Sequence, residues 1–441
     1  YIYAFIFLCF YIFGLSQTEY QWRSEASNGN WDDGDNWWDG SSITNTGFGV
    51  QLMSNNNQTN MVNNFAGTFN TFMLVFGNGA TDSRTISGNP FRMFDYSGNN
   101  PKIQNFSTAT HTFNTSINGD GDAADPLEIN LQSTGGLIWN GFVNNQGSWV
   151  DFYGVSNAIA RFNGVISGTG GIGVKTKTIV ALNAANTYTG NTEIDEGEIW
   201  LEDNGGISSL SNVYLGNGGK LDKIAKLFLA KSSGGQVLNN AINVNIGNSN
   251  TRYLGSLNSS GTNEFSGAII KNNDAGLNFE IVNIGATLAV TGGMSNRNTV
   301  INKIGAGKLI FSKNNFNINS QNIYIKNGIL EVDVFPSRFG GNSSIIIGDE
   351  GFSTLRILDT SSAYTSSFVS NGYGGAIEFN SQTNRSFSGA YLLNADLLIN
   401  NQSTKNLEFS NVISGSKNFI INSTGTGGVI LSYPNNNYTG N

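Results

Sequence analysis

Three blocks of the chain repeat one order of turns and short β-type runs, and this repetition limits the fold more than any other feature. The blocks span residues 162–201, 302–332 and 409–441, and they begin FNGVISGTGG, NKIGAGKLIF and FSNVISGSKN. Each continues into an asparagine-rich turn that contains an aromatic residue: Tyr188, Phe316 or Tyr438. A unit this short cannot bury its apolar face alone, so successive units must stack and share one core.

The rest of the chain shows the same pattern of short β-type runs separated by polar turns. Leu127–Leu131 (LEINL), Ala241–Ile246 (AINVNI) and Leu330–Val334 (LEVDV) alternate apolar with polar residues, which is typical of strands with one buried face. Glycine, at 56 residues, permits tight corners, and asparagine suits left-handed turn positions and amide ladders. We therefore expect an all-β fold, a right-handed parallel β-helix with roughly twenty residues per coil, over residues 44–441.

The first sixteen residues predict export. Residues 1–16 (YIYAFIFLCFYIFGLS) are uncharged and almost wholly apolar, which fits the core of a signal peptide cut before Gln17. Cys9, the only cysteine, lies inside this segment, so the mature chain would form no disulfide and would depend on packing and hydrogen bonds. Because the chain lacks a starting Met and the third block stops at Asn441, we expect further sequence at both ends.

One block resembles a known repeat. Thr178–Leu182 (TIVAL), Ala185–Gly190 (ANTYTG), Thr192–Ile194 (TEI) and Glu196–Ile199 (EGEI) follow in the order of the autotransporter-associated β-strand repeat of bacterial passenger proteins. The second block departs from it, with NFNIN in place of NTYTG. The resemblance implies a structural or adhesin-like passenger that is secreted or displayed at the cell surface, associated with the outer membrane. Its implied partners are secretion machinery and host or environmental glycans or surface proteins.

Charge and composition exclude other classes of function. The net charge is −8, only 12% of residues are charged, and no basic stripe is visible. Nucleic-acid binding needs a positive surface that replaces phosphate counterions, so we expect no nucleic-acid partner. His111 is the only histidine, and the chain has neither a cysteine partner for it nor a G-x-S-x-G motif. We therefore expect His111 at the surface or in a turn, no catalytic residues and no enzyme activity.

Two acidic clusters are the candidates for metal binding. Asp120, Asp122 and Asp125 space three carboxylates along one loop, as calcium prefers, and Asp32, Asp33 and Asp35 form a similar group. A calcium loop of the EF-hand type also needs a glycine at its sixth position and a glutamate at its twelfth, and neither follows Asp120. We expect solvated turns and no cofactor, with calcium at Asp120, Asp122 and Asp125 as the alternative.

A tryptophan-rich segment over residues 17–43 separates the signal peptide from the β-helix. Its tryptophans could seal the open end of the stacked core, which is the interpretation we favour, or stack on sugar rings: Trp22, Trp31, Trp37 and Trp38. The second interpretation belongs to an alternative function, a carbohydrate-binding or carbohydrate-active β-helix with lyase or hydrolase chemistry. Such an enzyme would gather carboxylates on one face of the solenoid.

Two further stretches give local expectations. Lys220–Lys231 (KLDKIAKLFLAK) has helical spacing and several lysines, so it is either a helical insertion between coils or another strand. Leu309 and Ile310 are neighbours in a β-type run, so one of the two side chains should point into the core.

Overall fold

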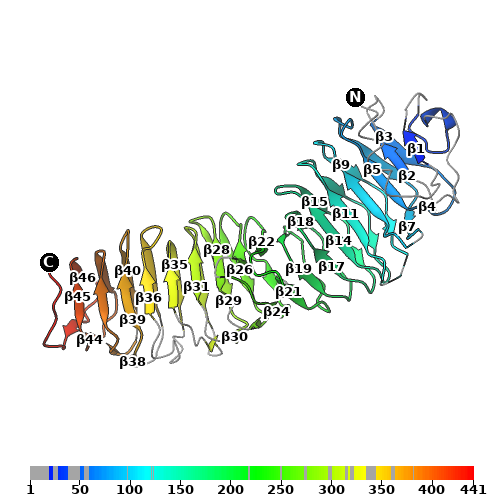
Figure 1. Ribbon diagram of the computed structural model, residues 1–441. Coiled ribbons are helices and arrows are strands. Elements are labelled where there is room, and N and C mark those ends of the chain that lie inside the picture. The colour runs from blue at the N-terminus through cyan, green and yellow to red at the C-terminus, as the bar shows by residue number, and fades with distance from the viewer. Residues whose placement is uncertain are drawn as a thin grey trace. The chain divides into compact units, whose positions relative to one another are not determined.

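The computed structural model describes residues 19–22, 28–37, 50–53, 59–96, 98–120, 122, 124–216, 219–248, 251–272, 276–295, 300–312, 316–317, 322–333, 344–358, 363–380 and 382–441. The expected signal peptide, Cys9, Trp38 and much of the tryptophan-rich segment lie outside these residues. Apart from one 3₁₀ turn, η1 (Gly34–Asn36), the described elements are strands, and their rows are parallel (Figure 1). The predicted all-β parallel β-solenoid is confirmed.

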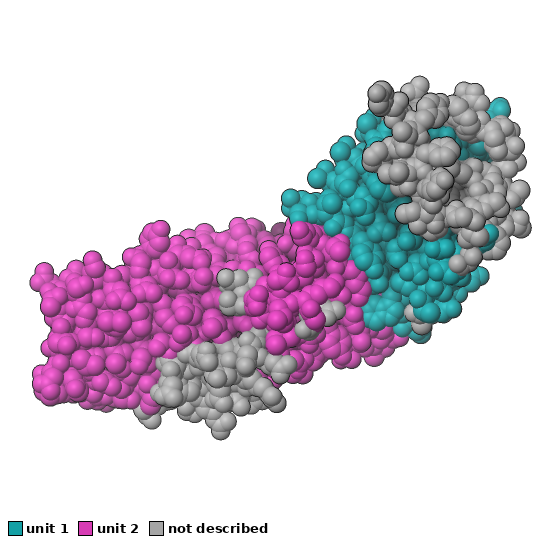
Figure 2. All heavy atoms as spheres, viewed as in Figure 1, with its two compact units in different colours: residues 1–160, 167–170 teal, residues 161–166, 171–441 magenta. Residues whose placement is uncertain are grey.

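The chain divides into two compact units, coloured separately in Figure 2. The first comprises residues 1–160 and 167–170, and the second comprises residues 161–166 and 171–441. β15 (Ile159–Phe162) and β16 (Ile166–Ser167) contain residues of both.

Coils of the first unit contribute one strand to each of three rows. The first row holds β1 (Glu19–Trp22), β2 (Val50–Met53), β5 (Met73–Phe76), β8 (Lys102–Asn105), β11 (Leu127–Leu131) and β14 (Val150–Gly154). The second holds β3 (Asn60–Asn63), β6 (Thr85–Gly88), β9 (His111–Phe113) and β12 (Leu137–Trp139). The third holds β4 (Phe69–Thr71), β7 (Phe91–Met93), β10 (Ile117–Asn118) and β13 (Val143–Asn144).

The second unit has four rows. Its first row holds β17 (Ile172–Val174), β19 (Thr192–Ile194), β21 (Val213–Leu215), β24 (Ile242–Val244), β27 (Ile269–Lys271), β30 (Met294–Ser295) and β33 (Phe316–Asn317). Its second row holds β18 (Ile179–Leu182), β20 (Gly197–Leu201), β22 (Ala225–Leu229), β25 (Arg252–Ser256), β28 (Leu277–Ile281), β31 (Ile301–Ile304), β34 (Asn322–Ile325), β36 (Ser344–Ile347), β39 (Ser367–Ser370), β42 (Tyr391–Leu393) and β45 (Ile413–Gly415).

Its third row is a nine-stranded sheet of β23 (Val237–Leu238), β26 (Gly261–Phe265), β29 (Ala286–Val290), β32 (Lys308–Phe311), β35 (Gly328–Val332), β37 (Ser353–Ile357), β40 (Gly375–Phe379), β43 (Leu397–Asn401) and β46 (Phe419–Ser423). Its fourth row holds β38 (Ala363–Tyr364), β41 (Arg385–Phe387), β44 (Leu407–Phe409) and β47 (Val429–Leu431). β38, β41 and β44 each follow a third-row strand and precede a second-row strand, which is the place in the coil that β33 holds in the first row.

Identical positions of successive coils lie on top of one another in the core. In the third row, Leu288, Leu309, Leu330 and Leu355 are consecutive register partners, and all four are buried. Ile310, the neighbour of Leu309, pairs with the outward Glu331 and is only half-buried. The prediction that one of the two side chains points inward is therefore confirmed, with Leu309 as the inward residue.

Coil length differs from the expected twenty residues. The side-chain amide of Asn183 donates to Asn163 Oδ1, 20 residues away, but the amide pairs Asn272–Asn245 and Asn394–Asn371 join residues 27 and 23 positions apart. The roughly twenty residues expected per coil hold between Asn163 and Asn183, but the other two coils are longer, because the turns between strands vary in length while the strands stay in register.

The two described copies of the VISG block fold alike. Asn186 Oδ1 accepts a hydrogen bond from the Ile166 N–H at 2.8 Å, and in the third block Asn436 Oδ1 accepts one from the Ile413 N–H at 2.9 Å. The glycines that follow, Gly168 and Gly415, have φ values of 110° and 114°. This left-handed backbone disfavours any side chain. The second block lies partly outside the described residues.

Lys220–Lys231, which the sequence left open between helix and strand, contains the strand β22 over Ala225–Leu229. Alternating burial along β22 places Ala225, Leu227 and Leu229 in the core. Within the described part of the chain, no helix is long and apolar enough to span a membrane.

Candidate functional site

Three of the four candidate tryptophans lie in the core of the first unit. Trp22, Trp31 and Trp37 are each 0% exposed, and Trp37 packs edge-on against the other two at centroid distances of 5.0 and 6.3 Å. The Trp37 Nε1–H donates to the Trp31 carbonyl at 2.8 Å, and Trp31 packs edge-on against Phe69 of β4. Rings buried in this way offer no face to a sugar and extend the core toward β1. Trp38 lies outside the described residues.

Asp120 is held between neighbouring coils. Its carboxylate accepts hydrogen bonds from the Ser148 hydroxyl at 2.7 Å, the Asp95 N–H at 3.2 Å and the Asp122 N–H at 2.9 Å. Asp122 in turn accepts from the Ala124 N–H, and desolvation together with the nearby Asp95, Asp122 and Asp120 raises the pKa of Asp125. Among the described residues, no group of three or more His, Cys, Asp or Glu side chains has the geometry to hold a metal ion. The contacts at Asp120 are those of a turn that joins coils.

Asp33, in the second acidic cluster, caps η1. Its carboxylate accepts from the Asp35 N–H at 3.1 Å and from the Asn28 side-chain amide at 2.9 Å. Asp32 and Asp35 lie on either side of this cap, so the spacing of the cluster follows from the local turn.

His111 is buried, and the expectation of a surface or turn histidine is wrong. It is the first residue of β9 and is 0% exposed, with its ring stacked on Phe76 at a centroid distance of 4.0 Å. Nδ1 accepts the Arg84 N–H at 3.2 Å. Burial, reinforced by the positive charge of Arg84, lowers the pKa of His111 to about 3. The fold keeps this imidazole neutral and inaccessible to a substrate.

Two cations occupy core positions of the second row and are satisfied by backbone carbonyls. Arg252 is 0% exposed, and its guanidinium donates to five carbonyl oxygens, including those of Lys223 at 2.5 Å and Ile246 at 2.7 Å. Lys303 stacks between the inward Phe279 and Ile325, and its ammonium donates to three carbonyls, the closest being Gly305 O at 2.7 Å. Burial lowers the pKa of Lys303 to about 7.

The outer face of the second row gathers charged and aromatic side chains around Lys226. The Lys226 ammonium lies 3.3 Å from Glu198 and 4.0 Å from Glu280, and 5.1 Å from the centroid of the Tyr253 ring. The Trp200 Nε1–H donates to Glu198 at 2.8 Å. Desolvation raises the pKa of Glu280, with the Lys226 charge opposing the shift and the Glu198 charge adding to it. This group is the Lys226 cluster.

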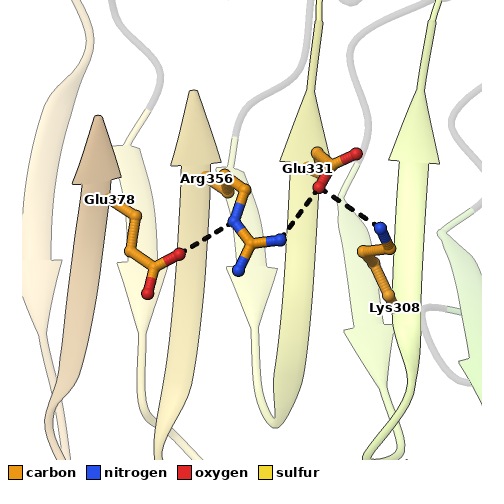
Figure 3. Close-up of polar contacts among 4 residues, drawn as sticks. All are labelled: Lys308, Glu331, Arg356 and Glu378. Atoms are coloured by element: carbon orange, nitrogen blue, oxygen red, sulfur yellow. Dashed lines mark hydrogen bonds and ion pairs between the residues drawn. The ribbon is translucent and has the colours of Figure 1, made fainter. Parts of the chain in front are cut away.

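A second charged group crosses the outer face of the third row on four successive strands (Figure 3). Glu331 on β35 lies 3.3 Å from Lys308 on β32 and 3.1 Å from Arg356 on β37. Arg356 Nε in turn donates to Glu378 on β40 at 2.8 Å. Glu331, Arg356 and Glu378 are direct register partners, so the sign of the charge alternates from coil to coil. We refer to these four residues as the charge ladder.

Neither cluster was identified from the sequence, although a signal for the ladder is present. When the runs are aligned on their inward residues, LEV at 330–332, LRI at 355–357 and IEF at 377–379 place a charge of alternating sign at the middle position. Carboxylates bridged by cations can stabilise the stack or bind polar ligands, but general acid–base chemistry needs a group that can exchange a proton with a substrate.

Comparisons with known proteins give no match to the chain among protein-family models, curated proteins or solved structures. The resemblance to the autotransporter-associated repeat therefore stays a prediction from the motif.

Proposed function

We propose that the chain is an exported, non-catalytic passenger-like protein whose β-solenoid is displayed outside the cell as a structural or adhesive element. The observation that carries the proposal is the charge ladder, in which each carboxylate is engaged by a cation of a neighbouring coil. Groups committed to coil-to-coil ion pairs stabilise a stack. The apolar segment over residues 1–16 supports export.

Display and lack of catalysis can be tested separately. Protease treatment of intact source cells should degrade the protein while a cytoplasmic marker survives, and deletion of residues 2–13 should abolish this accessibility. Protein that stays protected in intact cells and is released only on lysis would contradict display.

For catalysis, the purified 441-residue chain is incubated with pectins, alginates, xylans and glucans, with and without calcium. We expect no release of reducing or unsaturated ends. Turnover that is lost in Glu331→Gln or Glu280→Gln, but kept in a control Asp203→Asn variant at an exposed turn, would favour the carbohydrate-active alternative instead.

A further inference from the structure

Large aromatic side chains protrude from two consecutive turns of the second unit. Phe352, in the turn between β36 and β37, is 57% exposed, and Tyr373, in the turn between β39 and β40, is 69% exposed. The two turns belong to adjacent coils because β37 pairs with β40, and the Tyr373 N–H donates to the Gly348 carbonyl of the preceding turn at 2.9 Å. Burial of apolar rings stabilises a fold, so two exposed rings on adjacent turns indicate a binding surface.

The backbone holds these aromatics on rigid turns. Gly348 and Gly374 have φ values of 90° and 71°, and a side chain at either position would meet backbone oxygens at 2.2 and 2.6 Å. The Gly374 N–H donates to the Asn371 carbonyl at 2.8 Å, and the Asn394 amide of the next coil donates to Asn371 Oδ1 at 3.0 Å. Rings on such turns contact a ligand without a large loss of conformational entropy.

Polar groups around the rings are acidic or amide. Asp349 and Glu350 precede Phe352 on the same turn, and Asp396 occupies the equivalent turn one coil beyond Tyr373, where the Gly375 N–H donates to its carbonyl. Lys326 is paired with Glu350 at 2.7 Å, so it leaves the surplus negative charge of Asp349 and Asp396 in place. The Asp396 carboxylate accepts from the Asn418 N–H at 3.0 Å and from the Asn418 side-chain amide at 3.2 Å, which uses part of its acceptor capacity. This surface disfavours an anionic polymer and offers acceptors for hydroxyl groups.

From this combination we propose that the corner formed by Phe352, Tyr373 and the flanking Asp349, Asn371 and Asp396 binds a neutral, linear polysaccharide. Aromatic faces pack against the apolar faces of sugar rings, while carboxylates and amides bind the hydroxyls. Coils rise by about 4.8 Å, so a glycan along the stack would meet successive turns with successive sugars. The inference deepens the proposed display by giving it a ligand class, but the binding itself does not depend on export.

The test is affinity electrophoresis of the 441-residue chain in gels that contain cellulose derivatives without charge, xylan, mixed-linkage glucan or mannan. We expect retardation by at least one neutral polymer and none by alginate or pectate. The Phe352→Ser/Tyr373→Ser variant should bind roughly tenfold more weakly, whereas Tyr373→Trp should keep the affinity. Ile284→Ser is the matched control, because Ile284 is 87% exposed on a corresponding turn of another coil.

Circular dichroism and thermal unfolding of the serine variant should match the parent, because both rings are exposed. Failure of every neutral polymer to retard the chain, equal retardation of parent and serine variant, or preference for the anionic polymers would each overturn the proposal. Self-association in sedimentation velocity that disappears in the serine variant would assign the corner to a second copy of the chain instead. None of these outcomes bears on whether the protein is exported, so the two proposals fail independently.

Discussion

Asparagine side chains join the coils mainly through their amides. Asn186 accepts from the Ile166 N–H one coil earlier and donates to the Gly206 carbonyl one coil later, at 2.8 Å in both cases. Left-handed backbone, the other role expected of asparagine, occurs among the described residues at one asparagine, Asn157, while sixteen glycines adopt it. Glycine adopts that conformation with less steric strain because it has no Cβ. Asparagine in this fold instead uses its side chain to bind backbone groups between coils.

Replacement of Asn186 by Ala should therefore lower the free energy of unfolding by about 2 kcal/mol, because the buried Ile166 N–H loses its acceptor and two carbonyls each lose one of their two donors. The measurement is chemical denaturation of the purified chain. Asn183→Ala is the control, since the Asn183–Asn163 amide pair is exposed and should contribute only a few tenths of a kcal/mol. Equal effects of the two variants would contradict this role for Asn186.

Acid should destabilise the first unit through His111. The pKa is about 3 in the fold against 6.5 for the free group, so the unfolded chain binds the proton more tightly. The stability from the neutral imidazole is complete above pH 6.5 and is lost as the pH falls from 6.5 toward 3, by about 2 kcal/mol at about pH 5.

The test compares His111→Phe with the parent at pH 7.5 and pH 5. Phenylalanine keeps the stack on Phe76 but does not titrate, so the stability difference between parent and variant should shift by about 2 kcal/mol toward the variant at the lower pH. A difference that is the same at both pH values would mean that His111 titrates normally in the fold.

At the scale of the element, the charges on the outer face of the third row of the second unit favour the observed order of its strands. Parallel, in-register stacking places equivalent positions side by side, so repeats with identical charges would repel one another. Like-charge repulsion is avoided here because Glu331, Arg356 and Glu378 alternate in charge on successive strands (Figure 3). Lys308, on the strand before Glu331, forms an ion pair with it. These side chains are between 11% and 31% exposed, so solvent screens the ion pairs only in part.

Arg356→Glu should lower the stability of the second unit by about 1 to 2 kcal/mol, because three carboxylates would then be consecutive. Arg356→Gln removes the attraction without adding repulsion and should cost less. Thermal unfolding at low and high NaCl distinguishes the variants, since salt should restore Arg356→Glu more than Arg356→Gln. If salt did not change the difference in thermal stability between the two variants, the ladder would not act electrostatically.

At the scale of the whole molecule, stability is a sum over coils and their interfaces. Each coil contacts its neighbours through the rows and the shared core, so a destabilising substitution in one coil should loosen only the nearest coils. This local effect can be tested at Leu309, because Leu288, Leu309 and Leu330 are buried register partners on successive strands.

Leu309→Asp should bury an unpaired charge and cost several kcal/mol. Hydrogen exchange followed by mass spectrometry should show lost protection in β29, β32 and β35, while β8 and β11 of the first unit stay protected. Ile310→Asn is the control, because its side chain points outward on the same strand and adds no charge beside its register partner Glu331. Uniform loss of protection along both units would indicate all-or-none unfolding instead of independent coils.

Much of the fold follows from the sequence alone. Period-two alternation places Leu309, Leu330 and their equivalents on one face, and the repeated blocks require that face to be covered by another copy of itself. Parallel stacking of an all-β chain was therefore predictable. A turn was also expected at Asp120, Asp122 and Asp125, because the glycine and glutamate of a calcium loop are missing there, and the contacts described for Asp120 are those of a turn.

Tertiary structure alone decided which polar residues are buried and which charges meet. The partners of Arg356 are 22 and 25 residues away, so pairing depends on coil lengths that vary with each turn. His111 was expected at the surface or in a turn, yet it lies in the core, and the buried Lys303 ammonium is bound by three backbone carbonyls. Local alternation fixes the face of a strand, but register between distant strands is fixed only when the whole stack closes around its core.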